Sequence, residues 1–134
     1  MENQFVGYKE SKQLSKLGFS EECFGGYLKK DKTIWIGYVS SQGGEQFNRY
    51  YHILAPTFSQ AFKFFRDKYN LQHELCSLQK DSWLITIWDI SSTTEHGVYN
   101  GKRWDCDDLD ENIPHTYEEA EEVCLKKIIE IVKK

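Results

Sequence analysis

The clearest pattern in the chain is a run of apolar residues spaced three or four positions apart in residues 58–69. This period places them on one face of a helix, with charged residues on the opposite side. Thr57 and Gln60 form a capping-box pair, which satisfies two backbone N–H groups at the start of a helix. The pattern therefore predicts a helix over residues 58–69 that ends at Asn70. Its apolar face comprises Phe58, Ala61, Phe62, Phe65 and Tyr69.

The last part of the chain shows the same helical spacing after Pro114. Thr116 and Glu119 form a second capping box. Glutamates crowd the first turns and lysines the last turns, which complements the helix dipole. A long C-terminal helix is therefore predicted. Its apolar face comprises Tyr117, Ala120, Cys124, Ile128 and Ile131.

A third, shorter helix is predicted over residues 9–17, where Leu14 and Leu17 lie on one side. Gly18 follows directly and is suited to the left-handed conformation that ends many helices. In such an ending the chain folds back, so that Phe19 approaches Leu14.

The strands are predicted from short apolar runs bounded by turn residues. The lysine-rich stretch 29–32 separates the first two runs, which reads as a hairpin. The last run is apolar on both faces, which is typical of a central strand. An Asn100-Gly101 pair also predicts a small hairpin within the segment 91–113. The predicted strands span residues 23–28, 33–39, 49–54, 71–78 and 82–90.

Together these elements predict a single α+β domain over residues 1–134. We expect two layers, with a largely antiparallel sheet of five or six strands and helices packed on one face. The sequence contains no internal repeat and no linker that would divide the chain.

Composition narrows the possible functions. The chain has 134 residues and a formal net charge of -4, whereas sequence-independent binding to phosphates needs an excess of Lys and Arg. No apolar stretch reaches the roughly 20 residues that cross a bilayer, and the N-terminus has no secretory signal pattern. We therefore expect a cytoplasmic protein that contacts neither nucleic acid directly nor a membrane.

The cysteines and histidines predict no cofactor, no metal site and no catalytic pair. Cys23, Cys76, Cys106 and Cys124 are widely spaced, while a structural zinc site usually contains a closely spaced ligand pair. We expect these thiols to be reduced. Glu21 and Glu22 precede Cys23 and would raise its pKa. His73 and Cys76 lie an odd number of residues apart, so on a strand they face opposite sides.

Residues 105–122 are strongly acidic, with nine carboxylates and no Lys or Arg. Counted from Asp105, the segment does not match a calcium-binding loop, because Leu109 stands at a ligand position and Thr116 at the position of the bidentate Glu. One interpretation is an imitation of nucleic acid, in which the carboxylates replace phosphates. The simpler interpretation is a solvated loop followed by a helix N-terminus that favours anions.

Three ordered stretches resemble a family of small proteins from phages and prophages of Bacteroides and related gut bacteria. They are residues 13–24 (QLSKLGFSEECF), residues 53–57 (ILAPT) with 64–71 (FFRDKYNL), and residues 116–120 (TYEEA). Leu54 and the Phe64-Phe65 pair depart from the family pattern. The resemblance implies a phage or prophage origin and assigns no activity or catalytic residues.

Aromatic residues make up 15% of the chain, and aromatic side chains are frequent anchors of protein interfaces. We therefore expect a non-enzymatic protein-interaction module, which binds a partner protein or associates with itself. Two alternatives stay open: an acidic inhibitor that imitates nucleic acid to block a host DNA-binding protein, and a small enzyme whose site has no recognisable motif. The candidate surface residues are Tyr50, Phe64, Tyr99, Trp104, Asp105, Asp107, Asp108 and Asp110.

Overall fold

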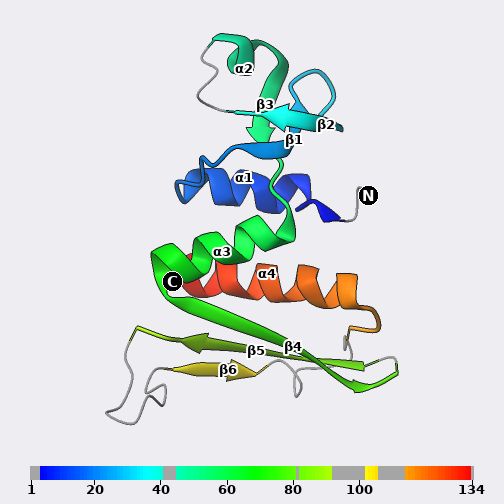
Figure 1. The fold of residues 1–134 in the computed structure, drawn as a ribbon, viewed down its shortest axis with the longest axis vertical. Coiled ribbons are helices and arrows are strands. Elements are labelled where there is room, and N and C mark those ends of the chain that lie inside the picture. Colours follow the sequence, from blue (N-terminus) through cyan, green and yellow to red (C-terminus); the bar gives the residue numbers. More distant parts are fainter. Residues whose placement is uncertain (1–3, 41–44, 81, 92–101, 106–113, 134) are drawn as a thin grey trace. The chain divides into compact units, whose positions relative to one another are not determined.

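The computed structural model describes residues 4–40, 45–80, 82–91, 102–105 and 114–133, which form four helices and six strands (Figure 1). The mixed α+β class is confirmed. The prediction of one sheet of five or six strands is wrong, because the described strands form two separate three-stranded antiparallel sheets. Each sheet belongs to one of two compact units, residues 1–61 and residues 62–134.

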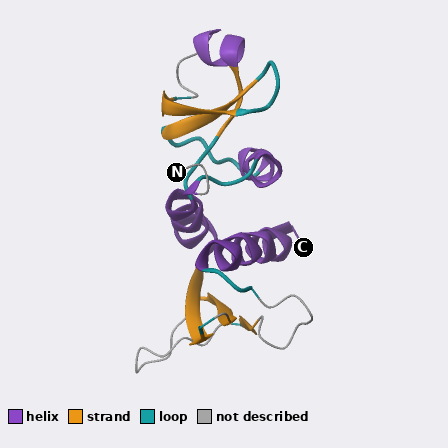
Figure 2. Ribbon diagram, turned by 90° about the vertical axis from the view of Figure 1, so that its right-hand side faces the viewer, coloured by secondary structure: helices purple, strands orange, loops and turns teal. Residues whose placement is uncertain are grey.

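The sheet of the N-terminal unit has β1 (Cys23–Leu28) at its centre, between β2 (Ile34–Val39) and β3 (Tyr51–Leu54). The pairing of β1 with β2 confirms the predicted hairpin. Helix α1 (Tyr8–Lys16) lies on one face of this sheet and the short helix α2 (Glu45–Tyr50) on the other (Figures 1 and 2).

The core of this unit lies on the α1 side of the sheet. Phe5, Tyr27, Ile53 and Ala55 are buried together there. The Tyr27 hydroxyl donates a 2.6 Å hydrogen bond to the backbone oxygen of Val6, so the buried phenol is satisfied. Strand β1 has glycine at position 25 because a Cβ there would lie 2.9 Å from the Phe5 ring.

Helix α1 ends as the sequence predicts. Gly18 has a φ of 102°, and its N–H donates to the backbone oxygen of Ser15 at 3.1 Å. The N–H of Phe19 donates to the backbone oxygen of Leu14 at 3.0 Å, which completes a Schellman motif. Leu14 and Phe19 are both buried.

Helix α3 spans Phe58–Tyr69, the predicted bounds. The Thr57 N–H donates to Gln60 Oε1 at 3.1 Å, and the Gln60 N–H donates to Thr57 Oγ1 at 3.3 Å. This reciprocal pair is the predicted capping box. The Gln60 side chain also donates from Nε2 to the backbone oxygen of Glu22 at 2.8 Å, which links the start of α3 to the chain before β1.

The predicted strand over residues 49–54 is partly wrong. Arg49 and Tyr50 belong to α2, and only Tyr51–Leu54 is extended. The backbone oxygen of Tyr50 accepts a 3.0 Å hydrogen bond from the N–H of Lys29, so the end of α2 is fixed against the turn between β1 and β2. The Phe47 ring also stacks on Tyr51, with ring centroids 5.9 Å apart. The aromatic residues of this segment favour a strand, but with these tertiary contacts residues 49 and 50 form the end of a helix.

The C-terminal unit contains β4 (Leu71–Gln79), β5 (Ser82–Asp89) and β6 (Arg103–Asp105) in that spatial order. Strand β5 is central, as predicted. Helix α4 (Tyr117–Lys133) lies along one face of this sheet (Figure 1). Asn70 has a φ of 58° where α3 turns into β4, which confirms it as the helix end.

The core of the C-terminal unit lies between α4 and the sheet. Ile85 and Ile87 of β5 are fully buried, as are Ala120 and Cys124 of α4. Tyr117 departs from the predicted apolar face. It is 47% exposed, because it stands in the first turn of α4 and contacts Trp83 only edge-on, at 5.4 Å.

The second capping box forms with a shifted partner. The Glu119 N–H donates to Thr116 Oγ1 at 3.1 Å, as predicted, while Glu119 Oε2 accepts a 2.9 Å hydrogen bond from the N–H of His115. The hairpin predicted around Asn100-Gly101 lies outside the described residues.

Candidate functional site

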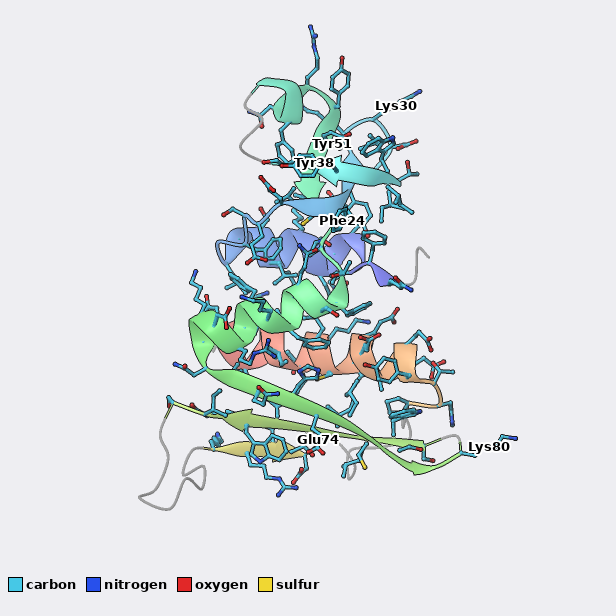
Figure 3. All side chains as sticks on the ribbon, viewed as in Figure 1. Phe24, Lys30, Tyr38, Tyr51, Glu74 and Lys80 are labelled. Carbon is cyan, nitrogen blue, oxygen red and sulfur yellow. The ribbon has the colours of Figure 1, made fainter. Side chains whose placement is uncertain are left out.

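The exposed apolar side chains of the described residues are concentrated in the N-terminal unit. Five of the seven large hydrophobic residues that are exposed lie on β1, β2 and α2, and the other two lie on α4. We call these five the hairpin surface, which includes both faces of the sheet because adjacent residues such as Trp35 and Ile36 point to opposite sides. Figure 3 labels Phe24 and Tyr38 among them. The hairpin surface comprises Phe24, Trp35, Ile36, Tyr38 and Tyr50.

Two glycines allow aromatic rings to lie against the backbone of this sheet. A Cβ on Gly37 would lie 2.3 Å from the Trp35 ring, and a Cβ on Gly26 would lie 2.9 Å from the Tyr51 ring. The two rings contact each other with centroids 5.8 Å apart. Gly37 also has a φ of 154°, a conformation that L-residues rarely adopt. The position of the Trp35 ring therefore depends on glycine at position 37.

One end of the hairpin surface is basic. Lys29, Lys30 and Lys32 occupy the turn between β1 and β2. Lys29 Nζ donates to the backbone oxygen of Asn48 in α2 at 3.5 Å, whereas Lys32 Nζ lies 5.4 Å from the centre of the Tyr8 ring in α1. Asp31 shares this turn. Its carboxylate accepts hydrogen bonds from Thr33 Oγ1 at 2.7 Å and from the Thr33 N–H at 3.1 Å. These bonds lower the pKa of Asp31 and keep it ionised.

The opposite end is acidic. Glu21 and Glu22 precede β1, at the end of the sheet where Cys23 pairs with Val39. The Tyr38 hydroxyl donates a hydrogen bond to the Glu22 carboxylate, and this bond is the largest cause of the raised pKa of Tyr38. The hairpin surface therefore has a polarity, with lysines at the turn and carboxylates at the open end.

Two of the aromatic residues predicted to lie at the surface, Phe64 and Trp104, lie outside the hairpin surface. Phe64 of α3 is half-buried and contacts Phe65 and Tyr69, with ring centroids 5.3 and 6.0 Å away. Trp104 of β6 is half-buried opposite Ile87, and Lys102 Nζ lies 5.3 Å from the centre of its ring. Both residues thus have packing partners within their own unit, whereas Tyr50 is 56% exposed.

The acidic candidates are described only in part. Asp105 of β6 accepts hydrogen bonds from Thr86 Oγ1 and Arg103 Nε, each 3.1 Å long. One of its oxygens is therefore engaged inside the protein. Tyr99, Asp107, Asp108 and Asp110 lie outside the described residues.

The thiols and imidazoles do not form a catalytic constellation in the described part of the chain. Burial, followed by the charge of Glu21, raises the pKa of Cys23 to about 12, so its thiolate is scarce. The register of β4 places His73 opposite Ile87 and Cys76 opposite Leu84, on alternate faces as expected. Within the described residues, no group of three His, Cys, Asp or Glu side chains is arranged to hold a metal ion.

Sequence reasoning did not identify four of the five hairpin-surface residues. Phe24, Trp35, Ile36 and Tyr38 lie in correctly predicted strands, but the sequence pattern alone does not show which strand residues are exposed. Trp35, Ile36 and Tyr38 lie on β2, which strand order places at the edge of the sheet, whereas Phe24 lies on the central strand β1. One signal was available: residues 34–39 contain no charged residue, although edge strands are usually protected by charge.

Comparisons with known proteins add no functional information. No protein-family model, curated protein or solved structure matches the chain. The resemblance to a phage family therefore stays a prediction. Within the described residues, no helix combines the length and apolar character that crossing a bilayer requires.

Proposed function

We propose that the protein is a non-enzymatic interaction module that binds a partner protein through the hairpin surface. The observation that carries this proposal is the concentration of exposed large apolar side chains on β1, β2 and the end of α2. Exposed aromatic side chains are costly to leave in water and are the preferred anchors of protein interfaces.

The contacts of the aromatic rings support a binding surface that is ordered before a partner binds. Trp35 is held in place by its contacts with Gly37 and Tyr51, so it loses little conformational freedom on binding. A pre-ordered anchor avoids part of the entropic cost of association. The lysines and carboxylates at the two ends would orient a partner and suppress incorrect ones.

The test is affinity capture from cells with three forms of the protein, compared by quantitative mass spectrometry. The first form is wild type, the second carries Trp35→Ser and Tyr38→Ser, and the control carries Tyr117→Ser and Val123→Ser on α4. Circular dichroism confirms that each form is folded. We expect wild type and control to retain the same partner, and the Trp35/Tyr38 form to lose it. Equal retention by all three forms would contradict the proposal.

A fourth form separates this proposal from the acidic-mimic alternative. Neutralising the aspartates removes charge from the acidic segment and leaves the hairpin surface unchanged. We expect this form to capture the same partner as wild type, and selective loss of a DNA-binding protein would instead favour the mimic. The substitutions are Asp105→Asn, Asp107→Asn, Asp108→Asn and Asp110→Asn.

A further inference from the structure

Strand β2 is an open edge. In the described part of the chain β2 pairs with β1 alone, so its outer backbone groups have no strand beside them. Its six residues, IWIGYV, carry no charge and no proline. Natural edge strands usually contain lysine or proline, which prevents pairing with another chain. Both Trp35 and Ile36, which face opposite sides of the sheet, are exposed.

A bulge limits the part of β2 that is free to pair. The register shifts between the pairs Gly25–Ile36 and Cys23–Val39, so β2 contains one residue more than β1 across this interval. The extra residue lies in the stretch that includes Gly37, and a bulge of this kind twists an edge away from regular pairing. The straight part of the edge is therefore Ile34–Ile36, with Trp35 at its centre.

The charges at the two ends of this edge would be complementary to those of a second, antiparallel copy of the same edge. The lysine turn precedes Ile34, and the Glu22 carboxylate is bound to Tyr38 beyond Ile36. If a second strand of the same sequence ran antiparallel with its Trp35 opposite the first, Ile34 would face Ile36. The lysine turn of one copy would then lie near the open end of the other, where the Glu22 carboxylate is bound to Tyr38. Because of the two-fold symmetry, this contact between the lysine turn and the Glu22 carboxylate would occur twice, once on each side of the axis.

We propose that the partner is a second copy of this chain, joined through antiparallel pairing of β2 with β2 about a two-fold axis at Trp35. This inference rests on the proposed function and names its partner. Two-fold dimers require a self-complementary surface, and the order basic, apolar, acidic along the β1–β2 hairpin meets that requirement. Two three-stranded sheets become one six-stranded sheet, and the two Trp35 rings form a cross-strand aromatic pair.

Charge reversal with rescue tests the arrangement. The oligomeric state is measured by sedimentation equilibrium over a range of concentrations. We expect wild type to be dimeric, and Lys30→Glu or Glu22→Lys to raise the dissociation constant by about tenfold. The double variant Lys30→Glu/Glu22→Lys restores the opposite pairing and should recover most of the affinity. Lys12→Glu and Glu118→Lys, which are exposed and distant from β2 in sequence, should dimerise as wild type does.

A backbone test complements the charge test. Ile36→Lys places a lysine in the free edge and should give a monomer that remains folded by circular dichroism. A monomeric wild-type protein at all concentrations would overturn the dimer, and so would single reversals that have no effect or a double variant that shows no recovery. If the monomeric wild type still captures another protein through Trp35 and Tyr38, the dimer fails while the proposed function stands.

Discussion

His73 makes the stability of the protein depend on pH in a predictable direction. Its ring stacks on Phe62 with centroids 3.8 Å apart. Burial, and then the nearby charge of Arg66, lowers the pKa of His73 from 6.5 to about 4. The folded protein therefore holds His73 neutral at a pH where the unfolded chain binds a proton.

The sign and size of the effect follow from this difference. A group whose pKa is depressed by folding contributes stability that is present above its unfolded pKa and lost as the pH falls toward the folded pKa. Between about pH 7.5 and about pH 5, a shift from 6.5 to about 4 corresponds to about 2 kcal/mol. Because the ring is only half-buried, solvent screening reduces this value, and we expect about 1–2 kcal/mol.

The measurement uses the variant His73→Phe, which keeps an aromatic ring on Phe62 and removes the titrating group. Urea unfolding at the two pH values gives the loss of stability for each protein, and the difference between the two losses isolates His73. An NMR titration of the imidazole gives its pKa directly. A pKa near 6.5, or equal losses in wild type and variant, would refute the reasoning.

Three local features give further predictions. Thr57→Ala removes the capping box of α3 and should lower the free energy of unfolding by about 1 kcal/mol in urea unfolding, with Ser59→Ala as an exposed control. Gly18→Ala forces a Cβ into the left-handed region and should cost about 1 kcal/mol in the same assay; an unchanged midpoint would contradict the Schellman ending. Iodoacetamide at neutral pH should alkylate exposed Cys76 and spare buried Cys23, as peptide mass spectrometry would show, and equal labelling would argue against that burial.

The parts of the fold that the sequence predicts are those determined by interactions between residues only a few positions apart. Thr57 and Gln60 predict the start of α3, and Gly18 predicts the end of α1, because both motifs are hydrogen-bonded within one helical turn. The hairpin of β1 and β2 was predictable for the same reason. Strands that follow one another across a short polar turn usually pair.

The arrangement of the sheets was not predictable from the same patterns. An apolar run indicates a strand but does not identify the strand beside it, so β3 and β4 gave no sign that they belong to different sheets. Tyr50 shows the same limit on a smaller scale. Its aromatic neighbours favour a strand, but Tyr50 ends a helix. Its backbone oxygen accepts a hydrogen bond from the N–H of Lys29, more than twenty positions earlier, and a sequence pattern does not show such a contact.

Tyr50 is the one residue of the hairpin surface that the sequence also singled out as a surface candidate. Exposure of an aromatic residue depends on what covers it, and that is decided by strand order and helix placement. Phe64 lies off the predicted apolar face of α3 and is half-buried, with ring contacts to Phe65 and Tyr69. Trp35 lies in a predicted strand, and its exposure became apparent only from the place of β2 at the edge of its sheet.

The side chain of Gln60 also bears on the order of events in folding. Its hydrogen bond to Glu22 joins positions 38 residues apart, and closing a loop of that length costs about 3 kcal/mol in chain entropy. The same side chain completes the cap that starts α3, so initiation of this helix is coupled to closure of the loop. The first turn of α3 should therefore become fully ordered only after β1 has reached its place. Substitutions at Gln60 should then accelerate unfolding more than they slow folding.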